Sequence, residues 1–178
     1  MHPRTQEVLS YLDAGRAQLE QAVAAIPEEA RSTNAAPGRW SVAQVLEHLS
    51  LVERRIGGLI VDQLDKARAM GIAADSETSL VVPTLDVRSL LDRSQKIAAR
   101  ENAMPVEGLP AAEGLKRVNE QRCRLRNAIL TADGSALGSV TAEHPRLGRL
   151  NLHQWIVFLG AHEQRHVMQI TESASHLM

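Results

Sequence analysis

Hydrophobic residues recur along most of the chain at steps of three and four positions, the spacing that places them on one face of an α-helix. The first such stretch covers roughly residues 4–26. A second begins near Ser41, which with Gln44 has the spacing of a capping box, and a third covers about residues 111–132. The last begins at Asn151 and continues into the C-terminal region. The pattern therefore predicts four long amphipathic helices.

The segments between these stretches predict connections of unequal length. Residues 71–85 lose the helical period and predict a loop that crosses the molecule, after which Asp86 is placed to cap a shorter helix through about Arg100. Residues 133–150 are rich in Gly, Ser and Pro and predict a turn-forming connection without strands. We therefore expect an all-α fold, a four-helix bundle with one additional short helix, as a single domain over residues 1–178.

The composition argues against several classes of function. The net charge of -1 offers no electrostatic reason to expect nucleic acid or an anionic membrane as a partner. The single cysteine, Cys123, has no partner for an internal disulfide, which fits a reducing compartment. The N-terminal residues lack the apolar segment of a signal peptide, and no window has the apolar length of a membrane span. We therefore expect a soluble, cytoplasmic protein.

Two histidines four residues apart, His162 and His166, are the strongest chemical signal. On a helix this spacing stacks both imidazoles on one face, and here that face is apolar. His48 lies on the apolar side of the second predicted helix. An unpaired imidazole in a dry interior costs on the order of 1–3 kcal/mol, so we interpret the three as ligands of one divalent ion. Three neutral nitrogens suit Zn, Ni, Fe or Co and leave a position for water or substrate, as in catalytic sites.

Other interpretations of these histidines stay open at this stage. Two amphipathic histidines can belong to an ordinary core, and a single inward His48 can be satisfied by a local hydrogen bond. The pattern of His162, Glu163 and His166 also matches zinc peptidases, in which the glutamate is the base. That interpretation requires a third ligand downstream, where Glu172 stands in place of a histidine, and Glu163 points about 100° away from His162 on a helix.

Arg122 interrupts the apolar stripe of the third long helix. If it faces a cavity, it could pair with a carboxylate of a thiol or substrate; otherwise it would extend to the bundle's end or pair with an acid of a helix. Arg122 and Glu163 are therefore the candidate catalytic residues.

Three blocks of sequence together resemble the signature of the DinB-like superfamily. They are WSVAQVLEHL at residues 40–49, HPRLGRL at residues 144–150, and Trp155 followed by AHEQRHVMQI at residues 161–170. Their order and separations also match, so the resemblance covers nearly the whole chain. It implies a bundle in up-down-down-up order with a long crossover between the second and third main helices, where residues 71–110 fall.

The resemblance also implies a divalent metal on His48, His162 and His166, with Zn or Ni foremost and Fe, Co or Mn as alternatives, and it implies a homodimer. Assigned relatives include metal-dependent S-transferases and isomerases that use low-molecular-weight thiols such as bacillithiol or mycothiol. A metal on three neutral imidazoles keeps its positive charge, which would lower the pKa of a thiol. The leading hypothesis is an enzyme that activates a thiol or water for attack on a small electrophile. The alternative is a non-catalytic, stress-related bundle in which the metal clamps two helices.

Overall fold

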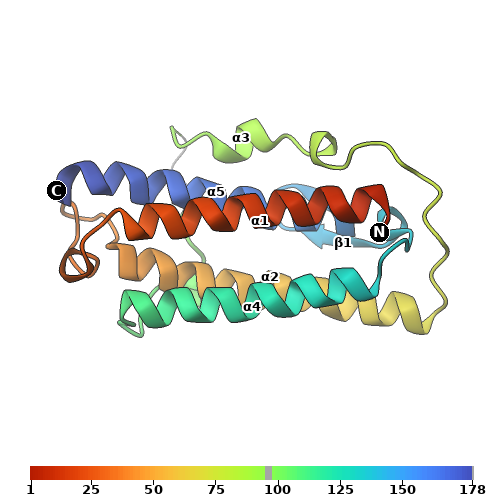
Figure 1. Ribbon diagram of the computed structural model, residues 1–178, viewed down its shortest axis with the longest axis horizontal. Coiled ribbons are helices and arrows are strands. Elements are labelled where there is room, and N and C mark those ends of the chain that lie inside the picture. The colour runs from red at the N-terminus through yellow and green to blue at the C-terminus, as the bar shows by residue number, and fades with distance from the viewer. Residues whose placement is uncertain (95–97, 178) are drawn as a thin grey trace.

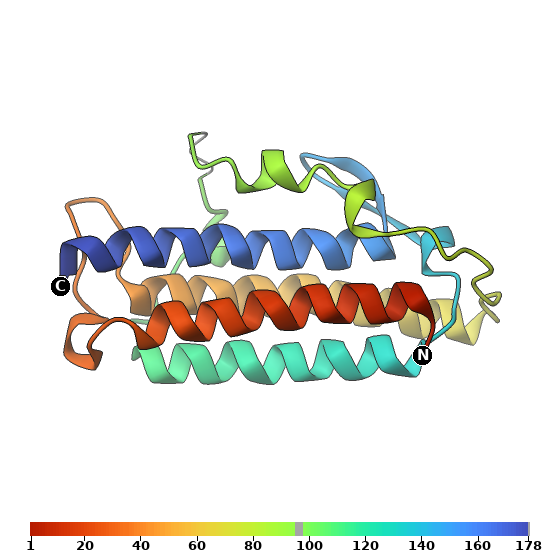
Figure 2. The ribbon, with the colours of Figure 1, turned by 45° about the horizontal axis from the view of Figure 1, so that its top comes forward.

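Four long helices lie side by side and form an elongated bundle in the computed structural model, which describes residues 1–94 and 98–177 (Figures 1 and 2). α2 packs mainly against α4, α1 packs against α5, and α2 also contacts α5. Following the colours of Figure 1, α1 and α5 run in one direction along the bundle and α2 and α4 in the other. The predicted mainly helical fold is confirmed. The four helices are α1 (Pro3–Ala24), α2 (Val42–Ala69), α4 (Ala111–Thr131) and α5 (Leu152–Leu177).

Capping boxes define the starts of the two helices that carry the histidines. The Ser41 hydroxyl accepts the backbone N–H of Gln44 over 3.2 Å, and the Gln44 side chain accepts the N–H of Ser41 over 2.9 Å. Asn151 and Gln154 make the same reciprocal pair ahead of α5, over 2.9 and 3.1 Å. Each box satisfies two backbone donors that the first helical turn would otherwise leave unpaired. Both predicted starts are confirmed.

The hydrophobic core is divided by a layer of polar residues. One apolar cluster includes Leu12, Ile56, Leu125 and Ile156, and a second includes Leu19, Leu46, Val118 and Ile170. Along every long helix a buried or half-buried polar residue separates the two clusters. These residues are Arg16 on α1, His48 and Glu53 on α2, Arg122 on α4, and His162, Glu163 and His166 on α5.

The crossover between α2 and α4 runs along the outside of the bundle (Figures 1 and 2). It contains the single-turn segments η2 (Val82–Thr84) and η3 (Glu101–Ala103) and the short helix α3 (Val87–Leu91), which packs on α5. Asp86 caps α3 as predicted, accepting the N–H of Ser89 over 3.1 Å.

The predicted extension of the short helix to Arg100 is wrong. α3 ends at Leu91, and Asp92 turns its carboxylate back onto the N–H of Ser94 over 2.9 Å. Such local side-chain bonds compete with the helical bonds of the backbone. The part of this prediction that covers residues 95–97 lies outside the described residues.

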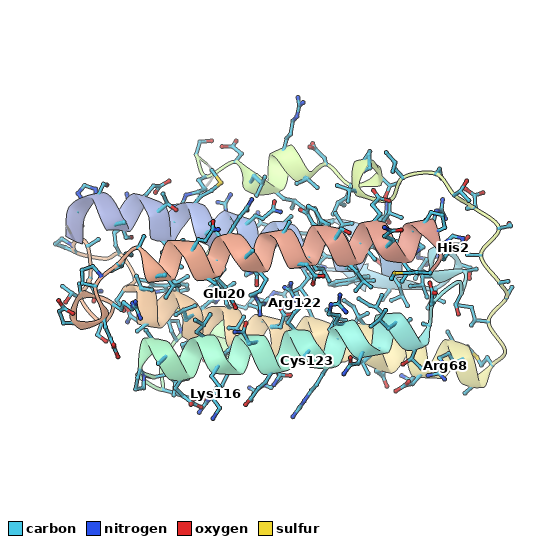
Figure 3. The ribbon with its side chains drawn as sticks, viewed as in Figure 1. His2, Glu20, Arg68, Lys116, Arg122 and Cys123 are labelled. Carbon is cyan, nitrogen blue, oxygen red and sulfur yellow. The ribbon has the colours of Figure 1, made fainter. Side chains whose placement is uncertain are left out.

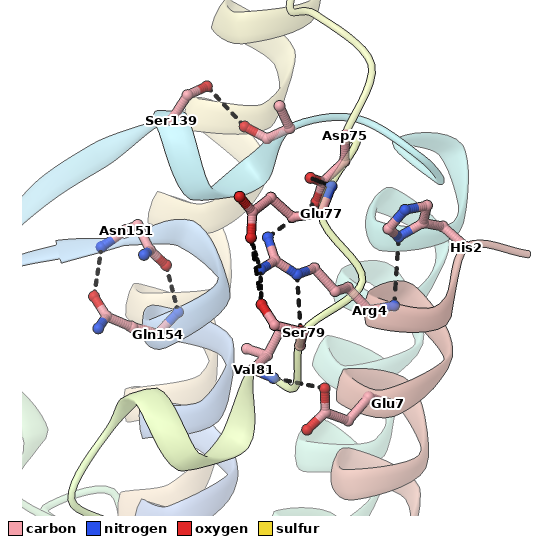
Figure 4. A network of polar contacts seen from close by, with 11 residues as sticks. His2, Arg4, Glu7, Asp75, Glu77, Ser79, Val81, Ser139, Asn151 and Gln154 are labelled. Carbon is pink, nitrogen blue, oxygen red and sulfur yellow. Dashed lines mark hydrogen bonds and ion pairs between the residues drawn. The ribbon is translucent and has the colours of Figure 1, made fainter.

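Polar side chains of α1 hold the first part of the crossover in place (Figure 4). Arg4 donates to the carbonyl of Ser79 over 3.0 Å and to the carboxylate of Glu77 over 3.0 Å. The carboxylate of Glu7 accepts the backbone N–H groups of Val81 and Val82, over 2.7 and 3.0 Å. Backbone donors of a segment without regular structure are thereby satisfied by a helix.

A small hairpin replaces the turn-forming connection predicted without strands before α5. β1 (Thr141–His144) pairs antiparallel with β2 (Gly148–Asn151), and the pairing ends at His144 and Gly148. Gly148 has a φ of +75°, a conformation that side-chain-bearing residues avoid, and it closes the turn. Strands of four residues are too short for an alternating pattern to stand out in the sequence, which explains the error.

No helix among the described residues has the length and apolar character that crossing a membrane requires.

Candidate metal centre

His48, His162 and His166 converge where α2 contacts α5. One ring nitrogen of each lies within 4.8 Å of the others, and Nε2 of His48 is 3.4 Å from Nε2 of His162. Two nitrogens that share a tetrahedral ion at ~2.1 Å are separated by about 3.4 Å. The donor set and the spacing of this pair therefore fit a divalent cation.

Hydrogen bonds on the far side of two rings orient their inner nitrogens. Nδ1 of His48 is 2.7 Å from the carbonyl oxygen of Ala103, and Nδ1 of His166 is 3.0 Å from Oε1 of Gln169. Both oxygens can only accept, so each Nδ1 carries the hydrogen and each Nε2 keeps its lone pair. This outer hydrogen bond is the arrangement that fixes histidine ligands in metal sites.

His162 differs from the other two histidines because its Nδ1 is buried and has no hydrogen-bond partner among the described residues. In the metal-free molecule its Nε2 can carry the hydrogen and donate to His48 Nε2 over the same 3.4 Å. On metal binding the hydrogen would move to Nδ1. An ordered water is the group that would satisfy that position.

Burial keeps all three imidazoles neutral near pH 7. Desolvation is the main cause that lowers the pKa of His166 to about 3, and the neighbouring His48 lowers it further. Desolvation also holds the pKa of His162 well below its usual range and lowers that of His48, to which the charge of Arg55 adds. Neutral imidazole is the form that binds metals, so few protons compete with a cation at this site.

Aromatic rings surround the three histidines. Trp40 lies 5.0 Å from His48 between ring centroids, and Phe158 lies 6.3 Å from His162. Trp155 is buried and contacts Phe158 edge to face at 6.0 Å. These are the three aromatic residues that lie in the two histidine-bearing stretches of the sequence. His48 is buried, while His162 and His166 are only half-buried, so the centre is accessible from one side.

The structure places Arg122 among the acids of the neighbouring helices. Its Nε and Nη2 donate to the two carboxylate oxygens of Glu53 over 2.6 and 3.1 Å, and its Nη1 donates to the carbonyl of Leu12 over 3.1 Å. Burial by itself lowers the pKa of Arg122, and the charges of Glu53 and Glu163 more than reverse this, so its pKa is raised. Figure 3 shows Arg122 between α4 and α1; Cys123, next to it, is exposed.

Glu163, the second catalytic candidate, belongs to the same buried network. Its Oε2 accepts from Arg16 over 2.6 and 3.1 Å and from Arg122 over 3.3 Å, while its Oε1 has no partner among the described residues. Arg16 also donates to Asn119 over 2.6 Å. Arg16 and Glu53 had no motif to mark them. Their only sequence signal is a charged residue inside an apolar stripe, as at Arg122.

Glu47, adjacent to His48, fixes the end of the crossover beside the three converging histidines (the triad). Its buried carboxylate accepts the backbone N–H of Glu107 over 2.6 Å and that of Leu109 over 3.2 Å. The same connector contains Ala103, the hydrogen-bond partner of His48. Glu47 therefore positions the segment that orients a candidate ligand, a role that no sequence pattern indicated.

Three histidines outside the cluster differ in their burial. His153 is 4% exposed, and burial lowers its pKa to about 4. His144, in the hairpin, is half-buried with its ring 4.5 Å from that of Phe158. His176 is exposed.

Comparisons with known proteins identify a family and a distant relative. The sequence profile of the DinB superfamily matches residues 11–170, a span that includes all three converging histidines. The chain is also similar to the uncharacterized protein YuaE of Bacillus subtilis (strain 168), with 24% identity over 165 residues that cover 92% of this chain and 95% of YuaE.

Proposed function

Because the chain belongs to the DinB superfamily and three of its histidines converge, we propose that it binds a divalent metal ion at a catalytic site. His48, His162 and His166 would hold the ion, with Zn or Ni as the metals that suit three imidazoles best. The proposal includes the up-down-down-up bundle order of the family. The observation that carries it is the pair of inward-facing Nε2 lone pairs, each fixed by a hydrogen bond at Nδ1.

We further propose that the reaction transfers a thiol or water to a small electrophile. When bound, the cation would supply positive charge that lowers the pKa of a thiol or water. The protein's own contribution is the set of aromatic rings near the histidines, Trp40 and Phe158 with Trp155 behind Phe158, and the partial exposure of His162 and His166. Because the protein supplies only three ligands to the metal, a coordination position stays free for the thiol or water.

A peptidase mechanism is disfavoured by the position of Glu163. Its Oε2 is paired with Arg16 and Arg122 inside the core. These ion pairs hold the carboxylate within the interior network, whereas a general base has to reach the water molecule at the metal. We assign Glu163 and Arg122 to the interior network that holds the helices in register.

Metal analysis of histidine variants tests the metal site. Protein purified without a histidine tag is loaded with Zn, and bound metal is measured by elemental analysis for the wild type and for the triple variant His48→Ala, His162→Ala, His166→Ala. We expect one ion per chain in the wild type and none in the triple variant. His176→Ala, which changes an exposed histidine on α5, is the matched control and should keep the ion. Stoichiometric metal in the triple variant would refute the proposal.

Cobalt substitution tests whether the site is catalytic or only structural. The absorption of Co²⁺-loaded protein should change when a thiol is added, because a free position allows sulfur to bind. A four-ligand sphere of protein groups that no thiol perturbs would instead assign the metal a clamping role between α2 and α5.

We also propose that the protein forms a homodimer, as the family resemblance implies. Sedimentation velocity at micromolar concentration should show a species of twice the chain mass. A monomer alone would contradict this.

A further inference from the structure

We propose that a carboxylate or phosphate group of the ligand binds beside the triad, between the guanidinium groups of Arg55 and Arg100. The inference rests on the proposed metal site for the position of the ligand's reacting end. It adds the chemical class of the ligand's other end, which would be anionic.

Arg55 lies on the histidine face of α2. It follows His48 by seven residues, which on a helix is two turns along the same face and a distance of about 10 Å. Its side chain is exposed. Burial is the main cause that lowers the pKa values of His48, His162 and His144, and the charge of Arg55 lowers each of them further. The guanidinium therefore lies within electrostatic reach of all three rings.

Arg100 comes to the same place from the crossover. Its carbonyl accepts the N–H of Ala103 over 2.9 Å, and the carbonyl of Ala103 is the group bonded to His48 Nδ1. The backbone thus anchors Arg100 to the triad. η3, which Arg100 precedes, contacts α2. The pKa of Arg55 is lowered by burial and then by the charge of Arg100, so the two cations lie within electrostatic reach of each other.

His144 adds a neutral donor from a third segment. Its Nδ1 accepts the backbone N–H groups of Arg146 and Leu147, over 3.3 and 3.1 Å, so its hydrogen sits on Nε2. Its ring lies 4.5 Å from Phe158, which in turn lies 6.3 Å from His162. Burial and then the charges of Arg100, Arg55 and Arg146 lower the pKa of His144, which keeps this donor neutral.

Three acids of α5, the crossover and the hairpin have partners of their own. Glu172 accepts hydrogen bonds from Nη2 and Nε of Arg93 over 2.8 and 3.0 Å. Asp92 accepts the backbone N–H of Ser94, and Glu143 pairs with Arg149 over 3.1 Å. Within the described part of the chain, the guanidinium groups of Arg55 and Arg100 have no carboxylate partner. Two guanidinium groups within electrostatic reach of each other and without a carboxylate partner form a site that a ligand oxyanion would complete by charge-assisted hydrogen bonds.

The first test uses metal-free protein, so that it does not depend on the triad. Succinate, methyl phosphate and the neutral 1,4-butanediol are titrated separately, and the Nε–H signals of the arginines are followed by NMR. We expect the signals of Arg55 and Arg100 to shift with an anion and to stay in place with the diol. The more strongly binding anion identifies carboxylate or phosphate as the preferred group. Equal responses to anions and diol would overturn the proposal.

The second test uses Zn-loaded protein and two thiols of similar size, 3-mercaptopropionate and 2-mercaptoethanol, with affinity measured by calorimetry. Arg55→Gln and Arg100→Gln should each weaken binding of the anionic thiol about tenfold and change binding of the neutral thiol by less than about twofold. Arg54→Gln is the matched control, because Arg54 is exposed on the same helix but lines the groove formed with Gly57 and Gly58. It should leave both affinities unchanged.

The two proposals fail in different ways. If neither thiol binds, the metal function is contradicted, and the titration of the metal-free protein still decides the anion site. If both thiols bind with equal affinity and neither arginine variant alters this, the metal function stands and the anion site is refuted.

Discussion

Arg122 and Glu53 form a two-pronged ion pair inside the bundle, with donor to acceptor distances of 2.6 and 3.1 Å. Both side chains are almost completely buried, at 5% and 3% exposed. The pair belongs to the polar layer that separates the two apolar clusters of the core. It therefore links α2 to α4 at the level of the histidines and offers a direct test of how the layer is held together.

Replacing Arg122 by methionine should destabilise the protein strongly. Glu53 would be left as a buried charge without its partner, and breaking a buried pair in this way costs about 3–5 kcal/mol. Arg126→Met is the matched control, since Arg126 makes a similar two-pronged contact with Asp13 on the exposed side of the same helix. There we expect a loss below about 1 kcal/mol. Urea unfolding measures both, and equal losses would contradict the assigned role.

Gly114→Ala should destabilise the contact between α2 and α4. A Cβ at this position would lie 2.9 Å from Cβ of Leu46 and 3.4 Å from the backbone nitrogen of Glu47. Overpacking of this kind costs typically about 1–3 kcal/mol, which outweighs the ~1 kcal/mol that alanine gains over glycine in a helix. At Gly58 on α2 no atom lies within 4 Å, so Gly58→Ala should raise the unfolding midpoint. A stabilised Gly114→Ala variant would show that the helices separate easily there.

Gln169→Leu should weaken metal binding without removing a ligand. The substitution leaves Nδ1 of His166 without its acceptor, and such outer hydrogen bonds are typically worth about 10- to 100-fold in metal affinity. Gln169→Glu keeps an acceptor at the same place and should bind metal at least as tightly as the wild type. Competition with a chelating dye gives the affinities. Unchanged affinity in the leucine variant would mean that packing alone orients His166.

The stability of the metal-free protein should fall as the pH is lowered from about 6.5 to about 4.5. In the folded state burial lowers the pKa of His153 to about 4 and, with His48, that of His166 to about 3. The unfolded chain therefore binds more protons than the folded one across this window, and stability is lost at up to about 1.4 kcal/mol per pH unit for each such group. Urea midpoints in the presence of a chelator measure the slope.

Single substitutions assign that slope to particular histidines. His153→Gln should reduce it, because one titrating group is removed, whereas His176→Gln should leave it unchanged, since His176 is exposed. Carboxylates of the unfolded chain also begin to bind protons below about pH 5.5, and the difference between each variant and the wild type cancels their contribution. A flat profile in the wild type would contradict the buried, neutral state of these imidazoles.

Local patterns in the sequence were sufficient for the long helices and for their starts. The three- and four-residue spacing and the capping boxes at Ser41 and Asn151 act within a few residues, so they can be recognised without knowledge of the fold. The hairpin and the end of α3 were mispredicted for the opposite reason. Four-residue strands and a helix of five residues carry too little periodic signal, and their packing against α5 contributes to their stability.

The candidate ligands were identified from the sequence because His162 and His166 share a helix face and His48 lies on an apolar one. The sequence alone could not tell which atoms orient their rings, since Ala103, the partner of His48, belongs to the crossover and follows that histidine by 55 residues.

By itself, the sequence determined which helices form, which faces they bury and that His162 and His166 share a face, since these depend on residue spacing along one helix. Only the tertiary structure decided that Arg122 and Glu163 belong to an interior ion network and that Arg55, Arg100 and His144 gather beside the triad. The physical reason is that the partner of a charge is chosen by distance in space, and those partners lie on different elements of the chain.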